Sequence, residues 1–334
     1  MRWRIIKSLL TFVVMPVVLV TGCGSQGAFF SILPTGQSFQ GSTQSNKIDV
    51  LWVVDNSGSM LTKQQNLRDS FDDFMTLFTA KNYDFQMAIV TTDTYPTPGG
   101  QNGNFQGVPT VISNVTPGFA AVFKANIVVG ATGAADAMGL DAINLALSPA
   151  KLAGPNTGFL RPDAHLVVIV LSDADDNDSA ATVANTFAFL KSVKPDTIDG
   201  GTGRSRQSFS VHAVMDDQTN PGPVPCVGSE DGIKFRDLAV LAGGSRMDIC
   251  ANNFSAGLAN LSEQIASFIS QVLLKQTPQV DTIEVLINGL PVAQSAVNGW
   301  TYEVTGNKLV FHGTAIPADS SQIAVTYIPT DIIR

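Results

Sequence analysis

Short apolar runs alternate along this chain with longer segments of helical periodicity, and this alternation limits the folds that the chain can adopt. Residues 48–54 and 166–171 are nearly continuous apolar runs, the pattern of strands buried on both faces of a parallel sheet. After the first run, Leu67, Phe71 and Phe74 recur at helical spacing, so that one side of a helix can pack on the sheet. Strand and helix in alternation predict a doubly wound, mostly parallel α/β sheet flanked by helices.

The same two patterns recur over the rest of the chain. Further strands are expected at residues 85–91, 108–113, 209–215 and 246–249. Further helices are expected at residues 119–126, 134–147, 179–193, 233–242 and 254–274. Beyond them, short alternating segments with Asn-Gly turns occur at residues 282–287, 300–304, 309–312 and 323–327. This change of pattern predicts a small C-terminal β-rich module over residues 277–334.

The beginning of the chain has the pattern of an export signal. Three basic residues in the first seven positions precede an uncharged, mostly apolar run at residues 9–20, which is too short to span ~30 Å of hydrocarbon but fits a signal-peptide core. The run ends in Leu-Val-Thr-Gly-Cys, which resembles the lipobox of bacterial lipoproteins. The resemblance implies removal of residues 1–22 and a lipid anchor on Cys23. Because a glycine follows that cysteine, it also implies the bacterial outer membrane, with the leaflet left open.

Two further cysteines, Cys226 and Cys250, form an even pair in a chain expected to be exported, which predicts a disulfide. Closing a loop of about 25 residues would stabilise the fold by roughly 3 kcal/mol. A zinc site built on these cysteines would need additional ligands, and none are evident beside them in the sequence. Residues 23–45 are rich in Gly, Ser and Gln, which predicts a flexible tether between the lipid and the first folded element.

Three oxygen-bearing side chains follow the first buried strand. Asp55, Ser57 and Ser59 are spaced Asp-x-Ser-x-Ser, so that one tight turn can aim three oxygens at a single point. The turn is expected at the carboxyl end of a sheet strand, where such sheets bind ligands. Oxygen-only ligands suit a hard cation, Mg²⁺ first, with Mn²⁺ or Ca²⁺ as alternatives. The plainer interpretation is a capped turn without metal, since Ser, Asp and Gly are common in turns.

The octapeptide at residues 53–60, Val-Val-Asp-Asn-Ser-Gly-Ser-Met, resembles the metal-ion-dependent adhesion site that opens a von Willebrand factor A domain. The resemblance extends over residues 46–276 and implies that a Thr from a second loop and an Asp from a third complete the site. Asp173, at the end of the second apolar run, matches the third loop. In the second loop Thr132 is the natural candidate. The family's Thr usually stands nearer to the following helix, so Asp136 is the alternative.

The same resemblance implies binding without catalysis, with an acidic side chain of a partner protein filling the open position on the cation. The net charge of −8 argues against nucleic acid as the partner. Neither a GxxxxGK[ST] loop nor a GxGxxG spacing is present for a nucleotide. Two alternatives remain: an envelope scaffold whose metal site is not essential, and a metal-dependent hydrolase. A hydrolase using Ser57 would need one of the three histidines within hydrogen-bond reach.

Four carboxylates crowd into the segment that follows residues 166–171. Besides Asp173 they are Asp175, Asp176 and Asp178. Their mutual repulsion would be relieved by solvent or by a bound cation, so a solvated loop and a separate Ca²⁺ site are both open interpretations. The spacing lacks the Gly and the Glu of an EF-hand loop.

Overall fold

The computed structural model describes residues 47–96, 101–135, 137–199, 202–224, 226–318 and 321–330. The expected signal peptide, the lipid site at Cys23 and the tether lie outside these residues, as does Asp136. None of the helices in the described ranges is long and apolar enough to cross a membrane.

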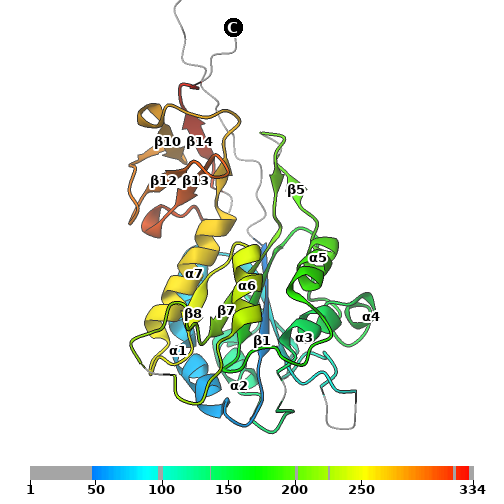
Figure 1. Ribbon diagram of the computed structural model, residues 1–334. Coiled ribbons are helices and arrows are strands. Elements are labelled where there is room, and N and C mark those ends of the chain that lie inside the picture. The colour runs from blue at the N-terminus through cyan, green and yellow to red at the C-terminus, as the bar shows by residue number, and fades with distance from the viewer. Residues whose placement is uncertain are drawn as a thin grey trace, which may run out of the picture. The chain divides into compact units, whose positions relative to one another are not determined.

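A six-stranded sheet lies at the centre of the fold, in the strand order β3-β2-β1-β4-β7-β8 (Figure 1). The strands are β1 Lys47–Val54, β2 Asp84–Thr91, β3 Val111–Ser113, β4 His165–Leu171, β7 Phe209–Met215 and β8 Arg246–Asp248. All of them run parallel except β3, which pairs antiparallel with β2. The strand order reverses direction between β1 and β4, and sheets of this type bind ligands at that switch point, outside the carboxyl ends of the strands.

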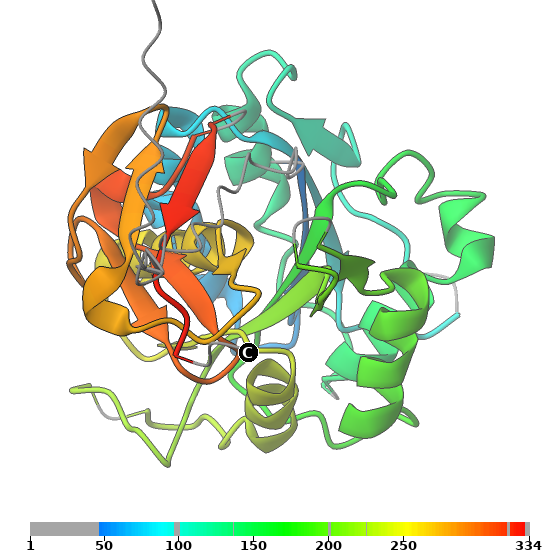
Figure 2. The same ribbon diagram turned by 90° about the horizontal axis from the view of Figure 1, so that it is seen from above.

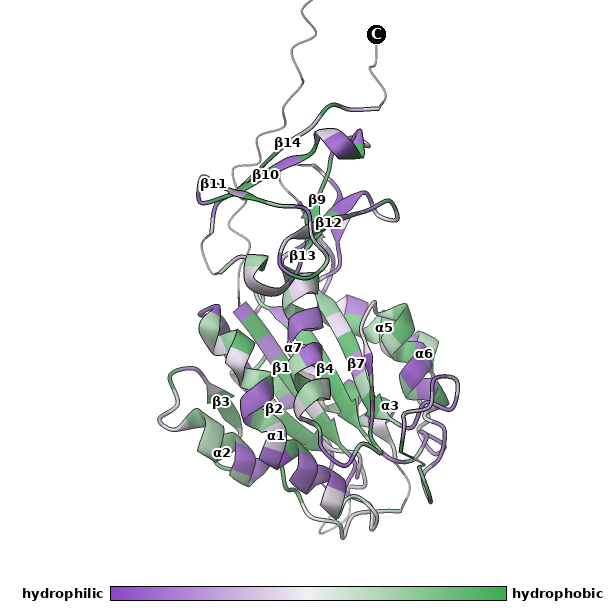
Figure 3. Cartoon of the chain, turned by 90° about the vertical axis from the view of Figure 1, so that its left-hand side faces the viewer, coloured by the Kyte–Doolittle hydropathy of each residue, from purple (hydrophilic) through white to green (hydrophobic). Residues whose placement is uncertain are grey.

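Helices cover both faces of the sheet, so the predicted fold class is confirmed. One face carries α1 Leu61–Ala80, α2 Phe119–Asn126 and α7 Ser255–Ile269, which lie in front of the largely apolar strands in Figure 3. The other face carries α3 Gly139–Ala146, α5 Val183–Val193 and α6 Ile233–Leu241, while α4 Pro149–Leu152 is a single turn. Alternate residues of β1 enter the two cores, because side chains alternate along a strand: Trp52 packs among the rings of Phe74 and Phe123, and Val53 enters the opposite core.

Three helices are shorter than their sequence patterns predict. α5 begins at Val183 rather than at residue 179, because the Thr182 side chain caps its first turn by accepting from the Asn185 N–H. Tertiary contacts explain the other two differences. α3 begins at Gly139 rather than at residue 134, because the preceding loop is held against another part of the chain through Gly133. α7 ends at Ile269 rather than at residue 274. The guanidinium of Arg206 donates to the Ile269 carbonyl, and the next residues form β9, Val272–Leu273, which pairs with a strand of the C-terminal segment. A short hairpin, β5 Thr197–Ile198 and β6 Ser205–Arg206, completes this part of the chain.

The C-terminal segment forms two three-stranded sheets next to the end of α7 (Figures 1 and 2). One contains β9, β12 Trp300–Glu303 and β13 Lys308–Phe311; the other contains β10 Glu284–Ile287, β11 Leu290–Val292 and β14 Ile323–Thr326. Trp300, Phe311 and Tyr327 belong to the same apolar cluster as the buried side chains of α1 and α7. In addition, Glu263 of α7 accepts a hydrogen bond from the Gly313 N–H at 2.9 Å. The C-terminal sheets therefore share one core with the helices on this face.

Two buried histidines on β4 and β7 contact one hydroxyl group. The Nε2 atoms of His165 and His212 lie 3.3 and 3.0 Å from Ser210 Oγ. The Ser245 N–H donates to His212 Nδ1 at 3.0 Å, so this nitrogen carries no proton. Burial lowers the pKa of His165 well below its usual value and lowers the pKa of His212 to about 3. Both rings are therefore neutral in the folded protein over the physiological range.

These histidines predict a loss of stability on mild acidification. Below pH ~6.5 the unfolded chain binds protons at both rings and the folded chain does not, so the free energy of unfolding falls as the pH falls. Between pH 7 and 5.5 we expect a loss of roughly 1 kcal/mol for each histidine. Urea unfolding at the two pH values, without added divalent cation, measures the loss. The variant His212→Gln should lose about half as much free energy of unfolding between the two pH values as the unaltered chain. Equal stability of the unaltered chain at both pH values would contradict the prediction.

Candidate metal centre

Polar side chains from the two strands at the switch point meet at the carboxyl edge of the sheet. Val54 and Leu171 are paired at the ends of β1 and β4, so Asp55 and Ser172 follow side by side. The Asp55 N–H donates to the Leu171 carbonyl at 2.9 Å, and Ser172 Oγ donates to Asp55 Oδ2 at 2.7 Å. The side chain of Asp55 is completely buried. The first candidate ligand is therefore fixed by the sheet itself.

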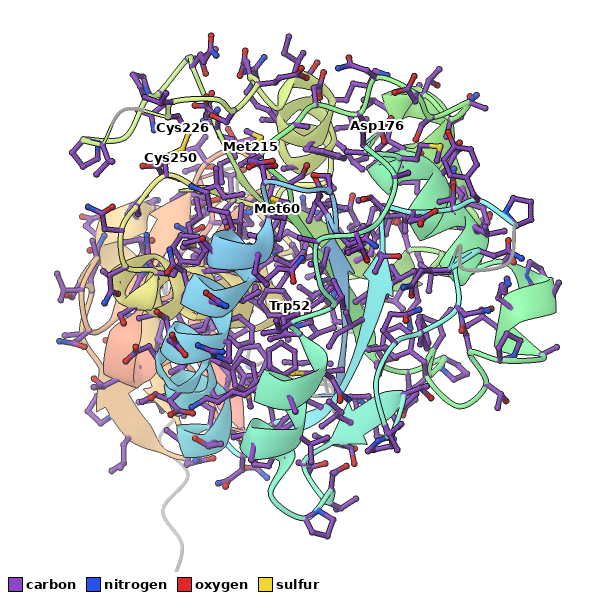
Figure 4. The ribbon with its side chains drawn as sticks, turned by 90° about the horizontal axis from the view of Figure 1, so that it is seen from below. Trp52, Met60, Asp176, Met215, Cys226 and Cys250 are labelled. Carbon is purple, nitrogen blue, oxygen red and sulfur yellow. A yellow bond between two sulfur atoms is a disulfide. The ribbon has the colours of Figure 1, made fainter. Side chains whose placement is uncertain are left out.

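The Asp-x-Ser-x-Ser turn leads directly from β1 into α1. The Ser57 N–H donates to Asp55 Oδ1 at 2.8 Å, and the Met60 N–H donates to the Ser57 carbonyl at 3.1 Å, just before α1 begins. Ser59 Oγ donates to Asp173 Oδ1 at 2.9 Å. The structure thus brings Asp55, Ser57, Ser59 and Asp173 together. Met60 and Asp176, which flank this region, appear at the same edge of the sheet in Figure 4.

The second loop lies against the turn. Gln64 Nε2 donates to the Asp55 carbonyl at 2.9 Å and to the Gly130 carbonyl at 2.8 Å. The Gly133 N–H donates to the Asn56 carbonyl at 2.9 Å. A Cβ at Gly133 would lie 2.3 Å from the Asn56 amide nitrogen, so a larger residue would displace the Asn56 side chain. Thr132 lies in this loop with an exposed side chain. Asp136, the alternative ligand, is outside the described residues.

Sequence reasoning did not identify Gln64 and Ser172 as part of the site. Gln64 is fully buried and lies three residues before Leu67, on the apolar stripe of α1. A polar residue on the buried face of a helix could have indicated this role, because a buried amide needs a hydrogen-bond partner. Ser172 offered only its position between an apolar strand and Asp173.

The electrostatics of the site favour a bound cation. Asp55 and Asp173 are both buried, and their carboxylates lie close enough to repel each other. The pKa of the Asp173 carboxyl is raised above its usual value, mainly by burial and also by the charge of Asp55. The hydrogen bond from Ser59 opposes this increase. Two buried carboxylates are unfavourable unless positive charge compensates them.

The chemistry of these side chains fits a hard divalent cation. Carboxylate and hydroxyl oxygens are the ligands that such ions prefer. Asn56 Oδ1, in the same turn, is buried and has no hydrogen-bond partner among the described residues, which is unusual for an amide oxygen. The donor set and this unused acceptor are both compatible with an ion held at the turn.

The acidic loop after β4 is only partly exposed, so the interpretation as a solvated loop is wrong for Asp176 and Asp175. Asp176 is fully buried and accepts hydrogen bonds from the Leu140 N–H at 2.6 Å and from Ser179 Oγ at 2.8 Å. Asp175 Oδ1 accepts from the Lys234 N–H at 2.9 Å. These carboxylates therefore bind backbone N–H groups in the first turns of α3 and α6, where negative charge is favourable. Only Asp178 is exposed.

The loop between β7 and α6 is tied to the site. Its Glu230 N–H donates to the Asp173 carbonyl at 2.9 Å, and the Glu230 carboxylate accepts from the Asn177 side chain at 3.0 Å. A disulfide joins Cys226 of this loop to Cys250, with Cα atoms 5.2 Å apart (Figure 4). One edge of the candidate centre is thus attached to a covalently closed loop.

A histidine base for Ser57 is absent from the site. His165 pairs in register with Ile48, at the start of β1, which places it about 20 Å from the end of that strand at ~3.3 Å per residue. His212 is held by Ser210 and Ser245, and His312 Nε2 contacts Thr301 at 2.8 Å in the C-terminal sheets. All three histidines of the chain are thus engaged elsewhere.

No protein-family model matches the sequence, and no curated protein matches it. Among solved structures, proximal thread matrix protein 1 from the mussel byssus is similar at 14% identity, over 70% of this chain and 50% of that chain, with a TM-score of 0.41. A structure of the same mussel protein described as having a zinc-occupied MIDAS motif gives 13% identity, coverage of 70% and 50%, and a TM-score of 0.40. The pilus adhesin SpaC from Lactobacillus rhamnosus GG gives 14% identity, coverage of 86% and 40%, and a TM-score of 0.38. This chain spans half or less of the length of these proteins.

Proposed function

We propose that this chain is a lipoprotein of the bacterial envelope whose doubly wound domain, of von Willebrand factor A type, binds a partner protein through a divalent cation and catalyses no reaction. The observation that carries the proposal is the convergence of Asp55, Ser59 and Asp173 at the switch point of the sheet. Oxygen ligands with two buried negative charges suit cation binding. The lipid on Cys23 and the outer-membrane location rest on the lipobox-like sequence alone.

Each residue has a distinct role in this proposal. Asp55 and Asp173 supply the negative charge that attracts the cation, and Ser57 and Ser59 supply neutral oxygens. Thr132 or Asp136 would complete the set from the second loop. When bound, the cation provides positive charge for an acidic side chain of the partner, with Mg²⁺ expected and Mn²⁺ or Ca²⁺ as alternatives. Gln64 and Ser172 hold the backbone and the Asp55 carboxylate in position.

Removal of the cation is expected to lower both partner capture and thermal stability. At a cation concentration of about 100 times Kd, binding adds about 2.7 kcal/mol to the free energy of unfolding. A pull-down from intact cells, using a purified chain that carries Cys23→Ser so that no lipid is attached, compares capture with and without EDTA. Thermal melts under the same conditions report the stability. Both effects should reverse when excess Mg²⁺ is added; capture that is equal with and without chelator would rule out a metal-mediated partner.

A further inference from the structure

Beside the disulfide lies a carboxylate of which only one oxygen accepts a hydrogen bond from the described residues. Asp248, at the end of β8, accepts a hydrogen bond at Oδ1 from the Cys250 N–H at 2.8 Å. Its other oxygen, Oδ2, is buried and has no hydrogen-bond partner among the described residues. A carboxylate oxygen in that state is unfavourable, because it has lost its water without gaining a hydrogen-bond donor.

The carboxylate of Asp248 lies beside the two sulfur atoms of the disulfide. The sulfurs of Cys226 and Cys250 and a carboxylate oxygen of Asp248 all lie within 4.8 Å of one another. In the part of the chain that the structure describes, no other group of three Cys, His, Asp or Glu residues is so close. The loop backbone crosses directly over the carboxylate at Gly222, where a Cβ would lie 1.7 Å from Asp248 Oδ2. The Asp248 carboxylate is therefore covered by the loop that carries Cys226.

We infer that reduction of the disulfide converts Cys226, Cys250 and Asp248 into a zinc site. Asp248, which stands two residues before Cys250, supplies the third ligand that the two cysteines lack. Two thiolates and a carboxylate are ligands that Zn²⁺ binds in proteins, and a water can occupy the fourth tetrahedral position. This donor set contains sulfur, whereas the centre at Asp55 contains only oxygen, so the two sites favour different metals.

Conversion of the disulfide into a zinc site requires only a dithiol reductant and Zn²⁺. A dithiol reductant donates two electrons and two protons, the bond between the Cys226 and Cys250 sulfurs breaks, two thiols form, and the reductant becomes a disulfide. Zn²⁺ then replaces the two thiol protons, which pass to solvent. Cys226 is partly exposed and its neighbour Val227 is 94% exposed, so a reductant can approach from this side. Oxidation and zinc binding exclude each other, because both use the same two sulfurs.

Cobalt spectroscopy of the full chain tests the inference. The chain is reduced, the reductant is removed under anaerobic conditions, and Co²⁺ is added as the probe. We expect a thiolate-to-cobalt absorption band that saturates at one Co²⁺ per chain, disappears on addition of Zn²⁺, and is absent from the oxidised chain. In a competition with a chromophoric chelator, Asp248→Asn should lower the affinity of the reduced chain for Zn²⁺ by more than about 100-fold, because a direct ligand is lost and not a supporting residue.

Two controls accompany this experiment: one distinguishes the zinc site from the centre at Asp55, and the other tests whether the variant folds. The thiolate band should persist in Asp55→Asn, because it arises from sulfur ligands. Circular dichroism melts of Asp248→Asn establish that the variant is folded. The inference is overturned if the reduced chain gives no thiolate band, if saturation requires two chains per metal, or if folded Asp248→Asn binds Zn²⁺ as tightly as the unaltered chain.

Discussion

Asp55→Asn is expected to abolish divalent-cation binding and leave the fold intact. Asparagine keeps the size of the side chain and one oxygen that can accept from Ser57 N–H or Ser172 Oγ, but it removes the negative charge at the centre of the site. Loss of a direct ligand should exceed the 10- to 100-fold effects seen for supporting residues, so we expect a drop of more than about 100-fold in cation affinity. Isothermal titration with Mg²⁺ or Mn²⁺ measures it.

The matched control is Asp178→Asn, which makes the same change of charge at an exposed carboxylate in the neighbouring loop. It should bind the cation normally. Normal binding by Asp55→Asn would place the ion elsewhere. A variant that loses the cation but still supports envelope assembly would instead favour a scaffold whose metal site is not essential.

Arg161→Met is expected to lower the free energy of unfolding by about 3–5 kcal/mol, since it removes the guanidinium that compensates the charge of a buried carboxylate. Asp49 is completely buried in β1, and Arg161 Nε lies 2.8 Å from its Oδ1. The same guanidinium donates to the carboxylate of Asp84 at 2.7 Å and to the Ile48 carbonyl at 3.1 Å. Urea unfolding at neutral pH provides the measurement.

The double variant Asp49→Leu with Arg161→Met should recover part of this loss, because both charges are then removed together. Asp49 lies near the start of β1 and Asp55 just after its end. Cation affinity should therefore be unchanged in Arg161→Met. A loss of less than about 1 kcal/mol, typical of exposed ion pairs, would show that the pair is more hydrated than its burial indicates.

The central strands could be predicted because their signal is local. A strand buried on both faces is largely apolar, so β4 and most of β1 are visible as runs of apolar residues. The apolar pattern of β7 is interrupted by the buried Ser210 and His212. Helix ends were less predictable. The start of α3 depends on the contact between Gly133 and Asn56, and the end of α7 depends on a strand that lies far along the chain. No local pattern carries such information.

Some residues of the candidate site could likewise be predicted from local sequence, and others could not. Asp55 and Asp173 each follow an apolar strand, and their resemblance to a known motif was sufficient to select them. Gln64 and Glu230 reach the site only because separate loops meet there, so sequence spacing gave no direct indication of their contacts. Asp176 was misjudged because a run of acidic residues usually faces solvent, whereas here the N–H groups of neighbouring helices draw one of them inside.

The position of β1 also determines how the molecule would carry a mechanical load. The strand begins at Lys47, and a ligand held at Asp55 would pull on its opposite end. Tension between such a ligand and the chain preceding Lys47 runs lengthwise along β1, which is paired with β2 on one side and β4 on the other. Extraction of the strand would require both ladders to shear at once. Hydrogen bonds loaded in parallel yield together, whereas those at a frayed edge break one after another, so the geometry favours resistance to force along this axis.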